Sequence, residues 1–267
     1  MVVGLPGNES PDSNRTTLIT PKSENDVRLR ATLGSQNPTG LPVGAVRKNI
    51  NMDVLFVKQG EYEKGDAAFP LIAEVVNVFF ALSEKPGHIT EESIRRTPEG
   101  RPYCSAAGDT DISVTHSGDI WMCLVSDGRC GVDFQYCRGH DSIKIVNRYY
   151  TEGEREYIEG GQTGQYTGSF IRTGEGRSGR FFDVWVRREA LGKYEGHGFF
   201  GNYPDSAPGG IPAESMYFIK DNTKDSKRVF VHEITRSMLV KEGVHAAGDF
   251  RAVCVSGSSD RPVIRRI

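Results

Sequence analysis

Four side chains in this chain have types suited to chemistry at a phosphate. They are two carboxylates, Asp133 and Glu189, one imidazole, His116, and one ammonium group, Lys193. Asp133 stands between a valine and a phenylalanine in an apolar stretch. An acid in such a place is costly unless it binds a cation or a hydrogen-bond donor. Mg²⁺ suits it, because proteins bind this ion through few carboxylates and leave its waters for phosphate oxygens.

Glu189 and Lys193 belong to a helix that we predict over residues 181–194, after a glycine-rich loop. At about 100° per residue, one side of this helix collects five residues: Phe182, Trp185, Val186, Glu189 and Lys193. The aromatic side chains indicate that this side faces the interior, where charges must be paired or bind something. The ordinary alternative is a surface Glu–Lys pair one turn apart, worth about 0.2–0.5 kcal/mol, and the helix alone favours it.

His116 and Arg101 are two further candidates for contact with an anion. His116 ends a predicted strand over residues 111–117, in a Thr-His-Ser-Gly turn whose hydroxyls and glycine can offer donors. A structural histidine fits this turn equally well. Arg101 lies in a Gly-Arg-Pro turn, where the rigid proline could hold it toward a phosphate. A solvated loop arginine is the more ordinary interpretation of that fragment.

The composition is that of an ordinary globular protein of 267 residues with a net charge of -2. Nothing in it indicates a nucleic-acid partner or a polybasic membrane surface. The start of the chain lacks the pattern of a signal peptide, and we expect no apolar run long enough to span a bilayer. The five cysteines form no C-x-x-C pair, which favours a reduced, cytoplasmic setting over a disulfide framework or a zinc site.

Local patterns predict the elements that must position these residues. In chain order they are a flexible segment at 1–47, a strand at 52–58, a helix at 67–83 capped by Asp66, a short helical turn or strand at 90–94, strands at 111–117 and 120–126, a hairpin turn at Asp127-Gly128, a strand at 131–135, helices at 141–150 and 151–159, an exposed loop at 160–180, the helix at 181–194, and strands at 215–220, 228–234 and 250–256. Thr151 and Glu154 form a capping-box pattern. Lys144, Arg148 and Arg155 are either a solvated face or a docking surface for an acidic partner.

Four motifs in this order resemble the 4′-phosphopantetheinyl transferases, in particular the larger surfactin-synthetase-activating type. They are the Gly-Arg-Pro turn at 100–102, His116-Ser117-Gly118, Gly131-Val132-Asp133, and Trp185-x-x-Arg188-Glu189-Ala190-x-x-Lys193. The stretch Arg-Tyr-Tyr-Thr-x-x-Glu at 148–154 is similar to a further family motif. The resemblance covers roughly residues 50–256.

The resemblance implies an α+β fold built as a pseudo-dimer of two similar α/β halves. Each half is a small antiparallel sheet with packed helices, and the active site lies in the cleft between them. Here the halves would be 48–130 and 131–257, preceded by the flexible segment 1–47 and followed by a loose C-terminal tail, 258–267. We expect a monomer, because the two halves are fused.

The implied reaction is transfer of the 4′-phosphopantetheine arm of coenzyme A to a serine of an acyl or peptidyl carrier protein. It depends on Mg²⁺, with Mn²⁺ as an alternative, and 3′,5′-ADP leaves. It would serve fatty-acid, polyketide or nonribosomal peptide biosynthesis. Asp133, Gln135 and Glu189 match the positions that hold the metal, and Glu189 is also the candidate general base. Gln135 stands where many members carry a glutamate, which changes the charge of the site.

The remaining family positions concern the coenzyme. Lys193 would contact the phosphates and stabilise the leaving group. His116 would hold a phosphate oxygen, with Thr115 beside it where the family usually has serine. Arg101 matches the basic residue that faces the nucleotide's phosphate. Arg188 replaces the usual lysine of the helix motif, and a guanidinium differs from an ammonium group in shape.

Two other classes stay open at this point. One is an inactive module on the same fold that binds coenzyme A or a carrier protein without turnover. The other is a metal-dependent phosphohydrolase that uses His116, Asp133 and Glu189. A further cluster of His and Asp, of the kind that two-metal sites need, is missing from the sequence pattern, which counts against the second class.

Overall fold

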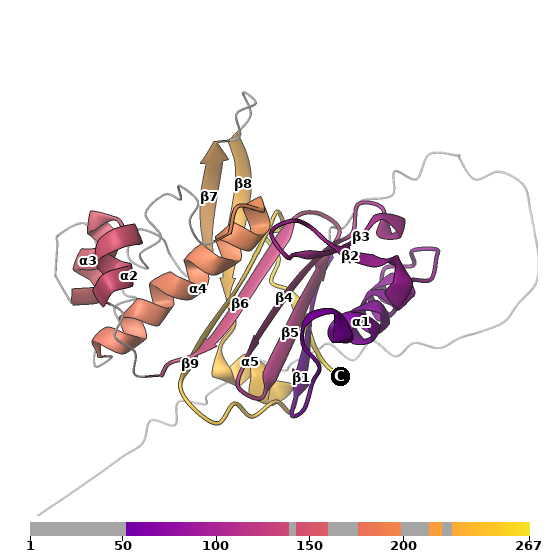
Figure 1. Ribbon diagram of the computed structural model, residues 1–267, viewed down its shortest axis with the longest axis horizontal. Coiled ribbons are helices and arrows are strands. Elements are labelled where there is room, and N and C mark those ends of the chain that lie inside the picture. The colour runs from indigo at the N-terminus through magenta and orange to yellow at the C-terminus, as the bar shows by residue number, and fades with distance from the viewer. Residues whose placement is uncertain (1–51, 139–142, 160–175, 199–213, 221–225) are drawn as a thin grey trace, which may run out of the picture. The chain divides into compact units, whose positions relative to one another are not determined.

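A computed structural model describes residues 52–138, 143–159, 176–198, 214–220 and 226–267 of the chain (Figure 1). All of these residues fall within one compact unit, Lys48–Ile267. The predicted flexible segment 1–47 and most of the predicted loop 160–180 lie outside the described residues. The fold is mixed α+β with several small sheets, and the relation of its parts as two similar halves stays a prediction.

The first four-stranded sheet has the order β10-β1-β5-β4. Its strands are β1 (Asp53–Gln59), β4 (Asp111–Ser117), β5 (Ile120–Ser126) and β10 (Val263–Arg266). β1 pairs antiparallel with β5 and parallel with β10, and β4 pairs antiparallel with β5. The hairpin of β4 and β5 turns at Gly118 and Asp119, as the alternation of polar and apolar residues predicts.

Helix α1 (Phe69–Leu82) packs on this sheet (Figure 1). Its apolar residues recur at three- and four-residue spacing and join the core next to β1 and β5. The predicted capping role of Asp66 is wrong. A 3-10 turn, Gly65–Ala68, precedes the helix, and the Asp66 carboxylate instead accepts a hydrogen bond of 2.6 Å from Arg96 Nε.

The segment Gly65–Leu82 is long and apolar enough to cross a membrane by length and composition alone. Our expectation that no apolar run reaches this length is therefore wrong. The interruptions at Glu74 and Asn77 are too few to lower the average. In the structure the apolar side of the helix, including Ile72, Val76 and Phe79, packs into the protein core, which accounts for the composition.

The second four-stranded sheet is antiparallel throughout, with the order β6-β9-β8-β7. Its strands are β6 (Cys130–Tyr136), β7 (Glu214–Lys220), β8 (Ser226–Glu233) and β9 (Phe250–Ser256). Helix α4 (Arg177–Glu195) packs on β6 and β9. It begins four residues before the predicted start at residue 181. The last residues of the predicted loop 160–180 therefore belong to the helix.

The remaining elements are shorter. They are a 3-10 turn at Glu91–Ser93, β2 (Ile94–Arg96), β3 (Pro102–Cys104), a 3-10 turn at Ser105–Ala107, α2 (Ile143–Tyr149), α3 (Glu152–Glu159) and α5 (Arg236–Lys241). β2 and β3 form a two-stranded sheet, and the loop between them carries Arg101. The capping box is confirmed. Glu154 Nα–H donates to Thr151 Oγ1 over 3.2 Å, and Thr151 Nα–H donates to Glu154 Oε2 over 2.8 Å.

The predicted hairpin at Asp127-Gly128 is wrong, because β5 and β6 are in different sheets. Locally, Asp-Gly between two apolar stretches is a strong hairpin signal. The residue contacts decide otherwise, since every residue of β6 pairs with β9, far along the chain. The chain therefore crosses from the first sheet to the second at this turn.

The edges of the two sheets meet at β4 and β6 through side chains. Backbone N–H groups of β6 donate to alternate side chains of β4: Cys130 to the Asp111 carboxylate over 2.9 Å, Val132 to Ser113 Oγ over 3.0 Å, Phe134 to Thr115 Oγ1 over 3.3 Å, and Tyr136 to Ser117 Oγ over 3.2 Å. We call this set the β4–β6 ladder. It satisfies buried donors that would otherwise have no partner at the edge of the second sheet.

The last residues are not a loose tail, contrary to our expectation for 258–267. Val263–Arg266 forms β10 and pairs with β1 from Val54 to Val57. Ile264 packs against the core that both sheets share, and Ile267 packs against the core under α1. The basic residues at this end led to the loose-tail prediction, but Ile264 and Ile267 between and after them pack on the core.

Candidate functional site

A close approach between α4 and β6 positions the acidic side chains. A Cβ atom on Gly131 would lie 2.0 Å from the Ala190 carbonyl oxygen and 2.8 Å from the Tyr194 nitrogen. Only glycine therefore allows the helix to lie so close to this strand. The close packing explains why the Gly-Val-Asp motif has a glycine at position 131. The same packing brings the last turns of α4 next to Asp133 on β6.

Asp133 is only 2% exposed, and one of its oxygens has two donors. Thr115 Oγ1 donates to Asp133 Oδ1 over 2.8 Å, and Lys193 Nζ donates to the same oxygen over 2.8 Å. Lys193 Nζ also donates to the Val132 carbonyl over 2.9 Å. Asp133 Oδ2 is buried and has no hydrogen-bond partner. Lys193 thus forms its ion pair with Asp133 rather than with Glu189, which argues against the simple surface pair along the helix.

Glu189 is the second acid of the site. Burial raises the pKa of its carboxyl and the nearby Asp133 raises this pKa further, whereas Lys193 lowers it. Among the residues that the structure describes, no hydrogen bond or ion pair to its carboxylate is found. The ammonium group of Lys193 pairs with Asp133, so Glu189 has no ion-pair partner among the described residues, and Asp133 Oδ2 lacks a donor. This arrangement fits a divalent cation bound by two carboxylates and by water.

The third predicted metal residue, Gln135, adds little to this pair. It lies two residues after Asp133 on β6 and lines a separate hollow with Phe182 and Trp185. Its side chain forms no hydrogen bond with any described residue. Within the described ranges no group of three or more His, Cys, Asp or Glu could hold a metal ion. Two carboxylates are therefore the acidic ligands that this part of the chain offers.

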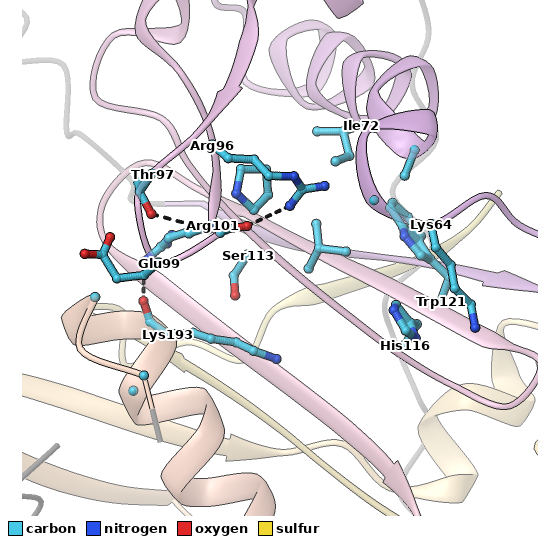
Figure 2. Close-up of a pocket in the computed structure, with 18 of the residues that line it drawn as sticks. Lys64, Ile72, Arg96, Thr97, Glu99, Arg101, Ser113, His116, Trp121 and Lys193 are labelled. Atoms are coloured by element: carbon cyan, nitrogen blue, oxygen red, sulfur yellow. Dashed lines mark hydrogen bonds between the residues drawn. The ribbon is translucent and has the colours of Figure 1, made fainter. Parts of the chain in front are cut away.

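Lys193, which pairs with Asp133, also lines a pocket of about 310 Å³ (Figure 2). Its walls come from the start of α1, the β2–β3 loop, β4 and the C-terminal end of α4. Five of its side chains are basic: Lys64, Arg96, Arg101, His116 and Lys193. Glu63 and Glu99 are its acids, and Ile72, Val114 and Trp121 give it an apolar part. A pocket with an apolar surface and several convergent cationic groups suits a phosphorylated ligand with a flat ring.

His116 lies in this pocket between two ammonium groups. Desolvation lowers the pKa of its imidazole, and the charges of Lys64 and Lys193 lower it further. Its ring lies 5.7 Å from the ring of Tyr62, measured between centroids. The positive charges that disfavour a charged imidazole would attract an anion, so this corner of the pocket is suited to a phosphate group.

Arg101 also lines the pocket, but its guanidinium is occupied by the protein. Nε donates to the Ile112 carbonyl over 3.2 Å, one terminal nitrogen donates to the Lys193 carbonyl, and the other donates to the Asp111 carboxylate and to the Cys130 carbonyl. These contacts differ from the phosphate contact that the resemblance implies. They join the β2–β3 loop to β4, β6 and α4.

Arg188, which stands at the position of the family's lysine, is 4% exposed and turns away from the acids. It donates to both oxygens of Glu154, over 2.9, 3.1 and 2.7 Å. Glu154 is fully buried. Its carboxylate accepts the Thr151 N–H at the start of α3 and also binds Arg188 of α4. The capping-box pattern predicted the first contact of Glu154, but no local signal indicated the second.

Lys64 and Arg96 are pocket residues that the sequence did not indicate. Lys64 precedes the turn before α1, and Arg96 ends β2, where it pairs with Asp66. Each looks like an ordinary solvated charge in the sequence. Only the folding of the β2–β3 loop against the start of α1 brings both to the pocket.

Comparison with known proteins gives one distant similarity and no family match. No protein-family model matches the chain. The 4′-phosphopantetheinyl transferase AcpT of Salmonella typhimurium is 29% identical over 100 residues, which are 37% of this chain and 46% of that protein. The chain thus spans less than half the length of this relative.

Proposed function

We propose that this protein transfers the 4′-phosphopantetheine arm of coenzyme A to a serine of a carrier protein. The observation that carries the proposal is the pair of carboxylates, Asp133 and Glu189, directly beside a basic pocket that shares Lys193 with them. The distant similarity to a phosphopantetheinyl transferase supports the same reaction class. Transfer of a phosphoryl group needs charge neutralisation and positioning more than covalent chemistry, and this site offers both.

The pocket would hold the nucleotide part of coenzyme A. Its volume of about 310 Å³ lies at the lower end of ligand pockets and leaves the pantetheine arm outside. Lys64 and His116 would contact phosphate oxygens at one side, and Lys193 would contact the pyrophosphate next to the acids. Ile72 and Trp121 supply the apolar surface for the adenine ring.

In the proposed reaction the serine oxygen bonds to the phosphorus of the pantetheine phosphate, and the bond from that phosphorus to 3′,5′-ADP breaks. Glu189 takes the serine proton, and its raised pKa makes it a stronger base than an ordinary carboxylate. Asp133 and Glu189 would hold Mg²⁺, which would neutralise charge on the pyrophosphate. Lys193 would stabilise the departing phosphate oxygen.

The carrier protein would approach near α2. Lys144 and Arg148 are exposed on this helix one turn apart, and Arg155 of α3 is partly exposed. A basic face of this kind suits an acidic carrier protein by charge complementarity. Which biosynthetic pathway the carrier serves is not part of this proposal.

The test is intact-mass spectrometry of an apo carrier protein incubated with this protein, coenzyme A and Mg²⁺. We expect a gain of one phosphopantetheine, about 340 Da by formula, and no gain with Glu189→Gln. Glu74→Gln, on the exposed side of α1, is the matched control and should keep full activity. An unmodified carrier at all times, with several carriers tested, would contradict the proposal.

One observation favours a second candidate, a module that binds coenzyme A without turnover. The described residues offer two acidic ligands and no group of three. If the metal binds too weakly, the pocket still binds the nucleotide. This candidate predicts coenzyme A binding by calorimetry with no modified carrier.

A further inference from the structure

Arg101 occupies the junction of four elements, and its contacts assign it a role that differs from ligand binding. We infer that Arg101 is a positioning residue that holds the C-terminal end of α4 on β4 and β6, rather than a residue that binds the phosphate of the nucleotide. The inference rests on the proposed function for its catalytic consequence. Its structural part concerns the folded protein alone.

The guanidinium of Arg101 has most of its N–H donors bound by the protein. Arginine has five N–H donors, and four hydrogen bonds to Asp111, Ile112, Cys130 and Lys193 already use this side chain. The side chain is 16% exposed, and its partner carboxylate on Asp111 is 23% exposed. One N–H is left for a ligand, so a phosphate could bind this guanidinium through two N–H groups only by replacing the ion pair or a carbonyl contact.

The contact between Arg101 and the Lys193 carbonyl caps the C-terminal end of α4. The helix ends at Glu195, so the Lys193 carbonyl is among the last four and lacks a partner within the helix. The His197 N–H, which would reach this carbonyl in a longer helix, donates to the Gly192 carbonyl over 3.1 Å instead. Arg101 supplies the missing donor, and its positive charge suits the negative end of the helix dipole.

Lys193 is bound by the protein through both its main chain and its side chain. Arg101 binds its main-chain carbonyl, while Val132 and Asp133 accept hydrogen bonds from its ammonium group. Asp111 strengthens this arrangement because its carboxylate also accepts the Cys130 N–H of the β4–β6 ladder over 2.9 Å. Arg101 thereby fixes the last two turns of α4, which include Glu189 and Lys193, relative to Asp133 on β6.

The experiment compares Arg101→Lys with Asp111→Asn. Asp111 is not among the described residues that line the pocket, so its substitution tests the Arg101 contact without touching a ligand. Lysine keeps the charge but not the planar fork, and asparagine keeps the shape of Asp111 but not its charge. Two readouts are measured on each variant: amide hydrogen exchange in residues 190–196, and the affinity for coenzyme A divided by that for 3′-dephospho-coenzyme A.

A positioning role predicts the same result for both variants. Exchange in residues 190–196 becomes faster, and transfer falls by about 10- to 100-fold because the reacting groups are misplaced. The affinity ratio stays within about twofold of the wild-type value, since no phosphate contact is lost. Lys64→Met is the control and should weaken coenzyme A binding without changing this exchange.

A phosphate-binding role predicts the opposite pattern. Arg101→Lys would then lower the affinity ratio and leave exchange unchanged, and Asp111→Asn would keep or improve coenzyme A binding by freeing Arg101. The inference is overturned if amide exchange in residues 190–196 is unchanged in both variants. It is also overturned if the affinity ratio of coenzyme A to 3′-dephospho-coenzyme A falls in Arg101→Lys. If the wild-type protein binds no coenzyme A, the proposed function fails, and the exchange measurement alone still decides whether Arg101 holds α4.

Discussion

Asp133, Glu189 and Lys193 place two carboxylates beside one ammonium group, next to the neutral imidazole of His116. Such a site is poor for stability, since burial and the nearby Asp133 disfavour the ionised form of Glu189. It is suited to binding a cation and an anion together, because each would relieve a charge that the folded protein leaves unbalanced. Two predictions concern these residues individually.

Glu189→Gln should stabilise the protein at neutral and alkaline pH. The folded pKa of Glu189 is raised above its ordinary value of 4.5, so the folded state binds the proton more tightly than the unfolded state does. Stability from this group is therefore fully present below the ordinary value and is lost as pH rises through the folded pKa. We expect the Tm of the variant to exceed that of the wild type at pH 8, with about 2–4 °C per kcal/mol gained.

The measurement is a thermal melt across pH 4 to 9 without divalent ions, with Glu74→Gln as the control. The difference between Glu189→Gln and the wild type should shrink toward acidic pH. A variant that melts below the wild type at pH 8 would show that Glu189 makes a stabilising contact which this account omits.

His116 should change charge when the pocket binds an anion. Its pKa in the free protein is lowered by desolvation and by Lys64 and Lys193, so it is mostly neutral at pH 7. Bound phosphate oxygens would favour the imidazolium, and affinity should therefore rise as pH falls through the free pKa. Titration of the imidazole by NMR with and without 3′,5′-ADP should show a higher pKa in the complex. An identical pKa in both states would remove His116 from the binding site.

At the scale of the elements, the β4–β6 ladder and the contact of Gly131 with α4 set the geometry of the acids. Thr115 has two roles in this ladder, because its hydroxyl accepts the Phe134 N–H and donates to Asp133. A residue of the same shape without the hydroxyl would leave one buried donor and one buried acceptor short of a partner.

Thr115→Val should destabilise the protein by about 1–3 kcal/mol in urea denaturation, the usual cost of an unsatisfied buried polar group. Thr115→Ser keeps the hydroxyl and should lose less than half of that amount. Equal stability of the valine variant and the wild type would mean that the ladder does not hold the two sheet edges together.

The elements also show what the sequence could predict and what it could not. The strands β1, β4 and β9 and the capping box at Thr151 depend on neighbouring residues, and these predictions are confirmed. The Asp127-Gly128 hairpin failed because the partner of β6 is a strand far along the chain. Local turn chemistry contains no information about that pairing.

The same reasoning applies to the site. The types of Asp133, Glu189 and Lys193 were recognisable, because their charges are unusual for the apolar strand and helix that carry them. The contacts of Arg101 and Arg188 were not, since each depends on elements from distant parts of the chain meeting at one point. The motif assigned Arg101 to a phosphate and gave Arg188 no partner, and the structure pairs both with carboxylates.

At the scale of the whole described unit, the C-terminal end of the chain forms an edge strand of the first sheet. β10 pairs with β1, and the Ile267 N–H donates to the Val57 carbonyl over 3.0 Å. The first sheet is thus completed by residues that follow the second sheet in sequence. The two sheets also share a core that contains Leu55, Val132 and Cys254, so neither sheet is complete without the other.

Removal of residues 263–267 should destabilise the whole unit, not only its end. Loss of Ile264 and Ile267 from the core, together with the β1 pairing, should cost about 2 kcal/mol or more. Urea denaturation should show one transition at a lower midpoint. Arg265→Ala, an exposed position, is the control and should leave the midpoint unchanged. A truncated protein as stable as the full chain would restore the loose-tail interpretation.

The central claim is that the acids and the basic pocket act as one transferase site. Its most direct test is simultaneous measurement of 3′,5′-ADP and modified carrier protein in one reaction with coenzyme A and Mg²⁺. The account predicts equal amounts of the two products at every time point and neither product with Glu189→Gln. Release of nucleotide without modification of the carrier would identify a phosphohydrolase, and bound coenzyme A with neither product would identify a binding module; either result contradicts the claim.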